Sequence, residues 1–199
     1  MLNFATIACV LAVGDSITFG IGAGVGRDWP SLLRDTGVEV RNVGRAGGTS
    51  ADAVSDEDGG HWRAMIEPNL DCNDLVIYME GSNDAQFYPQ PSGARYEANV
   101  LEFIRRVAPS PVFLLAPPPN LLNGEPKIAN IYLDEYRKVL RSIARRLPRV
   151  TYIDATRELT DPLAFECNVL GCPGIHPSAF GHELIFEKIM RKLRRLDGR

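Results

Sequence analysis

Short runs of Val, Ile and Leu alternate along the chain with longer amphipathic stretches, and this alternation constrains the fold more than any other feature. The apolar runs cover residues 5–13, 38–43, 75–79, 112–116 and 150–154. They are too short for typical helices and lack a polar face, as is typical of strands that are buried on both faces of a parallel sheet. The pattern predicts a five-stranded parallel sheet with helices on both of its faces.

The stretches between these runs have helical periodicity. Apolar side chains recur at helical spacing within residues 94–107, 128–147 and 178–196. Residues 29–35 are a shorter candidate, with Pro30 suited to a first helical turn. The chain has 199 residues, without an internal repeat or a low-complexity linker. We therefore expect one α/β domain over residues 1–199.

Charge and hydropathy exclude several function classes. A net charge of −3 argues against a general polyanion binder, so no nucleic acid partner is expected. The Lys and Arg residues within 137–149 and 188–199 are typical of solvated helix faces and helix C-termini. No apolar run reaches the ~20 residues that span a bilayer. Residues 1–13 lack the basic start of a signal peptide, which favours a cytoplasmic location.

The four cysteines are too few, in a chain of this length, to indicate a disulfide scaffold. Cys9 lies in an apolar run and is expected to be a small buried side chain. Cys167 and Cys172 are close enough in sequence to pair in an oxidising compartment. A zinc site from these two cysteines with His176 and His182 would lack a Cys-x-x-Cys pair, so no metal is expected.

Functional groups of such sheets collect on the loops that follow the strands. After the first run, Ser16 follows Gly14 and Asp15, where a strand end can expose a nucleophilic hydroxyl. Thr18 excludes the G-x-S-x-G elbow, and the glycines within residues 20–26 do not fit G-x-G-x-x-G.

The later loops supply the other groups that acyl transfer needs. Gly47 offers a backbone N–H, Asn83 offers a side-chain amide, and His176 offers a base. Each alone has an ordinary structural interpretation, as a turn glycine, a helix cap or a surface histidine. All of them together, each on a loop that follows a strand, indicate nucleophilic catalysis.

These residues resemble those of the SGNH hydrolases, also called the GDSL esterase/lipase family. Residues 14–18, 46–49, 81–84 and 174–177 are similar to four blocks of that family, in the same order. The resemblance implies a flavodoxin-like three-layer α/β/α sandwich. It also implies an enzyme without a metal or organic cofactor.

The same resemblance assigns roles to individual residues. Ser16 would be the nucleophile and His176 the base, with Ser16, Gly47 and Asn83 forming the oxyanion hole. Gly44 is the alternative to Gly47 in that hole. The expected activity is hydrolysis of a small or accessible acyl ester through an acyl-enzyme. The alternatives are acyl transfer to a sugar or lipid acceptor, and an inactive ligand-binding module on the same fold.

The chain departs from the family pattern beside the base. The family usually has an aspartate three residues before the histidine, where this chain has Pro173. A backbone carbonyl of residues 165–172 can replace it and fix the imidazole tautomer. Otherwise, a carboxylate from elsewhere must orient the imidazole, and the nearest in sequence are Glu166, Asp161 and Asp154.

Overall fold

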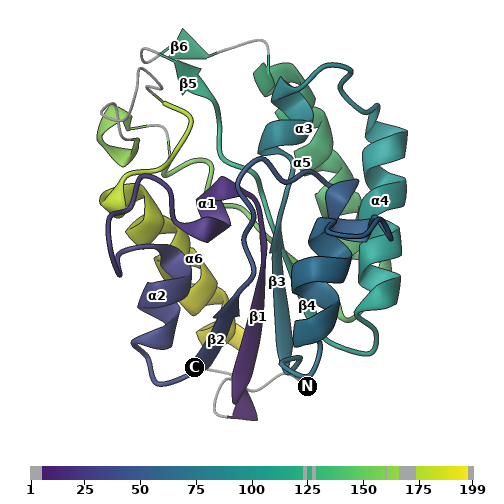
Figure 1. Ribbon diagram of the computed structural model, residues 1–199. Coiled ribbons are helices and arrows are strands. Elements are labelled where there is room, and N and C mark those ends of the chain that lie inside the picture. Colours follow the sequence, from purple (N-terminus) through teal and green to yellow (C-terminus); the bar gives the residue numbers. More distant parts are fainter. Residues whose placement is uncertain (1–5, 123–124, 127–128, 160, 166–173, 197–199) are drawn as a thin grey trace.

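Five parallel strands form the centre of the structure, a computed structural model that describes residues 6–122, 125–126, 129–159, 161–165 and 174–196. They are β1 (Cys9–Gly14), β2 (Glu39–Asn42), β3 (Leu75–Met79), β4 (Val112–Leu115) and β7 (Val150–Ile153), in the order β2-β1-β3-β4-β7 (Figure 1). The predicted parallel sheet is confirmed. β1 begins later than expected, and the N–H groups of Ala8 and Cys9 donate to Asp74 Oδ2 at 2.9 and 3.0 Å.

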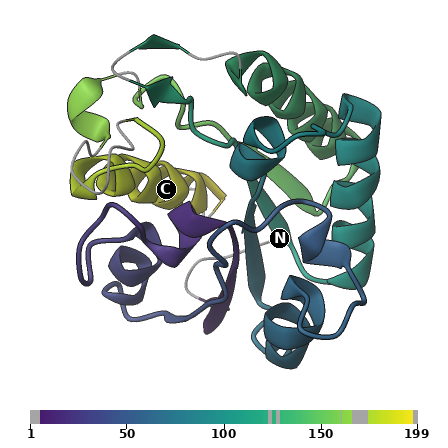
Figure 2. The ribbon, with the colours of Figure 1, turned by 45° about the horizontal axis from the view of Figure 1, so that its top comes forward.

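Helices cover both faces of the sheet, so the predicted three-layer α/β/α arrangement is confirmed (Figure 2). α2 (Trp29–Arg34) and α6 (Ala179–Leu196) pack together on one face. α4 (Gly93–Arg106) and α5 (Ala129–Arg146) pack together on the other. Alternate residues of each strand enter separate cores, because successive side chains of a strand point to opposite faces. No described helix is long and apolar enough to cross a membrane.

The sequence pattern did not reveal the short elements. α1 (Ser16–Phe19) and α3 (Ser82–Gln86) each follow a strand almost directly. The others are the turns η2 (Asp52–Val54), η3 (Trp62–Ile66), η4 (Glu67–Asn69) and η5 (Pro162–Ala164), and a hairpin of β5 (Leu121–Leu122) and β6 (Glu125–Pro126). Elements this short cannot show a hydrophobic period.

The prediction that Cys9 is a small buried side chain is wrong, because Cys9 is only partly buried and forms a disulfide with Cys72. The two Cα atoms are 5.1 Å apart, although 63 positions separate them in the sequence. They meet because β1 pairs with β3 in a register that places Val10 beside Leu75. Cys167 and Cys172 lie outside the described residues.

Removing this disulfide should destabilise the protein without inactivating it. By the chain-entropy model, a loop of this length gives about 4 kcal/mol of stabilisation. We expect Cys9→Ser and Cys72→Ser each to lower the free energy of unfolding by up to that amount, measured by urea denaturation. Activity below the unfolding transition should persist, because Cys9 and Ser16 lie at opposite ends of β1. A reductant should lower the urea midpoint of the wild type and leave the midpoints of the two variants unchanged. An unchanged wild-type midpoint would contradict the prediction.

Candidate active site

The turn after β1 fixes the position of Ser16. A Cβ on Gly14 would lie 2.2 Å from Thr18 Oγ1 and 2.5 Å from the Met79 carbonyl oxygen, so only glycine fits there. Asp15 then caps α1, since its Oδ1 accepts the N–H of Ile17 at 2.9 Å. Ser16 is therefore the first residue of α1, at the carboxyl edge of the sheet.

Ser16 and His176 meet directly although 160 positions separate them in the sequence. Ser16 Oγ lies 2.9 Å from His176 Nε2. The histidine is half-buried, and this burial lowers its pKa below the usual 6.5. A neutral imidazole at pH 7 can accept the serine proton, as general base catalysis requires.

The glycine-rich segment after α1 supports the base. A Cβ on Gly22 would lie 2.4 Å from the Pro177 carbonyl oxygen and 3.1 Å from His176 Cβ. Gly22 also has a φ of +94°, which favours glycine. On the other side, Pro177 forms a β-bridge with Phe165. Close backbone packing from two segments therefore holds the loop that carries His176.

The two candidate glycines of the second loop differ in their environment. The Gly44 N–H already donates to Asn42 Oδ1 at 2.9 Å, so it is not free to bind an oxyanion. Within the described part of the chain, the Gly47 N–H has no hydrogen-bond partner. Gly47 has a φ of +78°, and a Cβ there would meet no described atom within 4 Å. Gly47 therefore faces open space, and alanine at this position would be strained.

Asn83 lies beside this loop. Its Nδ2 donates to the Gly48 carbonyl oxygen at 2.8 Å, which leaves the second amide hydrogen available. The next residue, Asp84, accepts hydrogen bonds from the backbone N–H and hydroxyl of Ser50. These bonds tie the loop after β2 to the start of α3, and they bring Asn83 next to the Gly47–Gly48 turn.

The described candidates for the orienting acid bind other groups. Asp154 accepts hydrogen bonds from the Tyr152 hydroxyl and from Thr156, and it pairs with Arg141. Asp161 accepts the Leu163 N–H at 2.8 Å and is exposed. Glu166 and Pro173 lie outside the described residues.

Of the four possible zinc ligands, the structure describes only the two histidines, and both have other contacts. His182 is fully buried, and its Nδ1 accepts the Trp29 N–H at 3.2 Å. His176 contacts Ser16 instead, and both Cys167 and Cys172 lie in a segment that the structure leaves undescribed. In the described ranges, no group of three or more His, Cys, Asp or Glu side chains could hold a metal ion.

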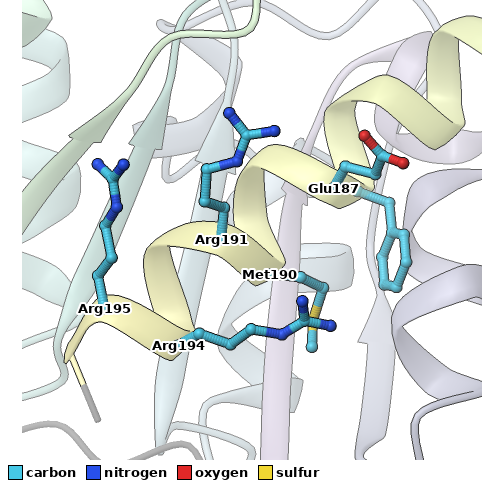
Figure 3. Close-up of a pocket in the computed structure, with 6 residues that line it drawn as sticks. Glu187, Met190, Arg191, Arg194 and Arg195 are labelled. Atoms are coloured by element: carbon cyan, nitrogen blue, oxygen red, sulfur yellow. The ribbon is translucent and has the colours of Figure 1, made fainter. Parts of the chain in front are cut away.

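A pocket of about 420 Å³ opens beside Asn83. Its wall includes Thr49, Ala51 and Arg95, and the largely exposed rings of Phe87 and Tyr88. A larger hollow of about 520 Å³ lies along α6, from which Arg191, Arg194 and Arg195 project (Figure 3). None of the six residues lining that hollow belongs to the Ser16–His176 pair, so its size alone does not mark a catalytic site.

The low pKa of His176 can be measured directly. We expect its imidazole resonance to titrate below pH 6.5 and the acidic limb of kcat/KM to fall in the same range. An adjacent carboxylate would favour the imidazolium and raise the pKa instead. The chain has three histidines, and His176→Ala assigns the signal. A midpoint above 6.5 would contradict the prediction and indicate an ionised partner.

Comparisons with known proteins identify the family. The model of the GDSL-like Lipase/Acylhydrolase family matches residues 12–184. A comparison with curated proteins found no match.

Solved structures share the fold at low sequence identity. A lipolytic protein of the G-D-S-L family from Desulfitobacterium hafniense is 23% identical, with a TM-score of 0.72 over 92% of this chain and 98% of that one. An acetylxylan esterase from Geobacillus stearothermophilus is 20% identical, with a TM-score of 0.69 over 92% and 93%. A carbohydrate acetylesterase family member from Sinorhizobium meliloti is 19% identical, with a TM-score of 0.71 over 96% and 99%. The chain belongs to the GDSL-like lipase/acylhydrolase family and is a carboxylic ester hydrolase.

Proposed function

We propose that this protein is a serine esterase that hydrolyses short acyl esters through an acyl-enzyme on Ser16. The observation that carries the proposal is the 2.9 Å contact between Ser16 Oγ and His176 Nε2. A nucleophile within hydrogen-bond reach of a base is the arrangement that covalent acyl transfer requires.

The proposed reaction has two stages. Ser16 Oγ attacks the ester carbonyl while its proton passes to His176 Nε2. Collapse of the tetrahedral intermediate expels the alkoxide, which takes that proton from His176. Water then attacks the acyl-enzyme, gives a proton to His176, and releases the acid as Ser16 recovers its hydrogen. These steps need neither a metal ion nor an organic cofactor.

We assign the oxyanion hole to three donors from neighbouring loops. They are the N–H groups of Ser16 and Gly47 and the second amide hydrogen of Asn83. The Ser16 and Gly47 N–H groups have no hydrogen-bond partner among the described residues, and the amide is held by its bond to Gly48. Fixed donors of this kind stabilise the negative charge that develops on the carbonyl oxygen.

The substrate is proposed to occupy the pocket beside Asn83. Its volume of about 420 Å³ suits a small molecule. Phe87 and Tyr88 offer apolar surface at the rim, while Thr49 and Arg95 offer hydrogen-bond donors. Two of the solved relatives are named as acetylesterases of carbohydrates, so acetylated sugars are the first natural substrates to examine.

The proposal is tested with a fluorophosphonate and a series of p-nitrophenyl esters. The wild type should be labelled at Ser16, and it should hydrolyse the acetyl ester faster than long-chain esters. An unlabelled protein without esterase activity would indicate a binding module. Formation of a new ester when sugar or lipid alcohols are added would indicate an acyltransferase.

Asn83→Ala should act on the transition state more than on the bound substrate. We expect kcat to fall by about a hundredfold or more with little change in KM, because one oxyanion donor is lost. Steady-state kinetics on p-nitrophenyl acetate measures both constants, and Gln86→Ala on the same helix is the control. A higher KM with an unchanged kcat would show that Asn83 binds substrate and does not serve the oxyanion.

A further inference from the structure

Two buried polar side chains, Glu80 and His61, lie near the site without a role in the proposed reaction. Glu80 follows β3 and directly precedes Gly81, while His61 precedes η3. Neither side chain has any exposed surface. Burying a carboxyl group and an imidazole costs free energy unless they are paired, so their presence needs a physical reason.

The contacts of His61 determine its tautomer. His61 Nε2 lies 2.6 Å from the Val43 carbonyl oxygen. Because a carbonyl oxygen only accepts, Nε2 carries the hydrogen and Nδ1 of the neutral ring is an acceptor. Nδ1 faces Glu80 Oε1 at 3.6 Å. This separation is longer than a hydrogen bond, and in the described part of the structure neither this nitrogen nor the two carboxyl oxygens of Glu80 has a hydrogen-bond partner.

Burial drives both groups towards their neutral forms. It raises the pKa of Glu80 well above the usual value and lowers the pKa of His61. The carboxyl groups of Asp15, Asp84 and Asp52 also raise the Glu80 pKa, while Arg45 opposes them. A protonated Glu80 is a donor, and it faces the acceptor Nδ1 of His61.

Both groups pack against the turn that carries the proposed oxyanion donor. A Cβ on Gly48 would lie 3.3 Å from Glu80 Oε1 and 3.6 Å from His61 Nδ1. The Gly48 carbonyl oxygen accepts the Asn83 amide, and the Gly48 N–H donates to the Arg45 carbonyl oxygen at 2.9 Å. The pair therefore lies against the Gly47–Gly48 turn, with His61 bound to the loop after β2 and Glu80 directly after β3.

We propose that Glu80 and His61 are positioning residues for ester hydrolysis. Together they hold the Gly47–Gly48 turn against the end of β3, so that the Gly47 N–H and the Asn83 amide face the same oxyanion. The inference rests on the proposed function. It assigns to these two residues an effect on the transition state through neighbouring donors, without contact to the substrate.

Substitutions at Glu80 test the proposal. Glu80→Gln keeps a donor towards His61, whereas Glu80→Met keeps the length without a donor. We expect Glu80→Met to lower kcat about a hundredfold with an unchanged KM, because small displacements of catalytic groups have effects of this size. Glu80→Gln should stay within about threefold of the wild type. If Glu80→Met does not fold, Glu80→Leu replaces it, and Glu57→Leu on the surface is the control.

A second comparison separates positioning from general stability. In an Asn83→Ala background, Glu80→Met should cost less than in the wild type, because one of the two donors that Glu80 positions is already absent. The proposal is overturned if the kcat of Glu80→Met lies within about tenfold of the kcat of Glu80→Gln. It is also overturned if the losses of kcat in Glu80→Met and Asn83→Ala are fully additive. Failure of the proposed function would look different, since the wild type itself would then lack Ser16-dependent hydrolysis.

Discussion

Replacing Ser16 with alanine is expected to lower kcat for ester hydrolysis by about a millionfold, the scale reached when a catalytic nucleophile is removed. The substitution deletes the oxygen that attacks the carbonyl carbon and leaves His176 without its partner. A slow residual reaction should remain above the rate in water, because the oxyanion donors still bind the transition state.

The fold should tolerate this substitution. The Ser16 carbonyl oxygen accepts the N–H groups of Gly20 and Ile21, and alanine retains both bonds. Asp15 still caps the helix through Ile17. We expect an unchanged circular dichroism spectrum and thermal midpoint, with Ser142→Ala at an exposed position of α5 as the matched control. A Ser16→Ala enzyme that keeps more than a trace of activity would exclude Ser16 as the nucleophile.

The sheet and its long helices could be predicted because their patterns are local. Val, Ile and Leu runs fall on the five strands, and the stripes of α4, α5 and α6 repeat over several turns. The Cys9–Cys72 disulfide could not be predicted in this way, since it depends on the β1–β3 register. The sequence around one cysteine does not show which distant segment will lie beside it.

The residues of the candidate site could likewise be predicted from the sequence, whereas the contacts between them could not. Ser16, Gly47, Asn83 and His176 could be named because each follows a strand and has the chemistry that acyl transfer needs. Ser16 directly follows β1, but His176 lies far beyond the end of β7, so the contact between them depends on how Gly22 and Phe165 pack against Pro177.

Glu80 and His61 were missed because nothing around them in the sequence marks a pair. One signal was present, since Glu80 is an acidic residue directly after the fully buried strand β3. The full burial of its side chain could be known only from the tertiary structure. Residues that break a local rule in this way are often found at functional sites.

Replacing His176 with alanine is expected to cost as much as replacing Ser16, and the double variant should be no slower than either single one. The two side chains act as a unit in the same step, so removing the second should cause no further loss of kcat. Additive losses in the double variant would show that they act separately. Kinetics on p-nitrophenyl acetate measures all three variants.

Substitutions of the candidate orienting acids are expected to have only small effects on kcat. Asp154→Asn and Asp161→Asn should keep kcat within about tenfold, because their carboxylates bind Thr156, Tyr152 and Leu163. We expect the same of Glu166→Gln, since a neutral backbone carbonyl suffices to fix the tautomer of His176. A dyad of this kind stabilises the imidazolium less than a carboxylate would. A drop of about 10⁴ in any one variant, as when the aspartate of a triad is neutralised, would overturn the dyad and identify the orienting acid.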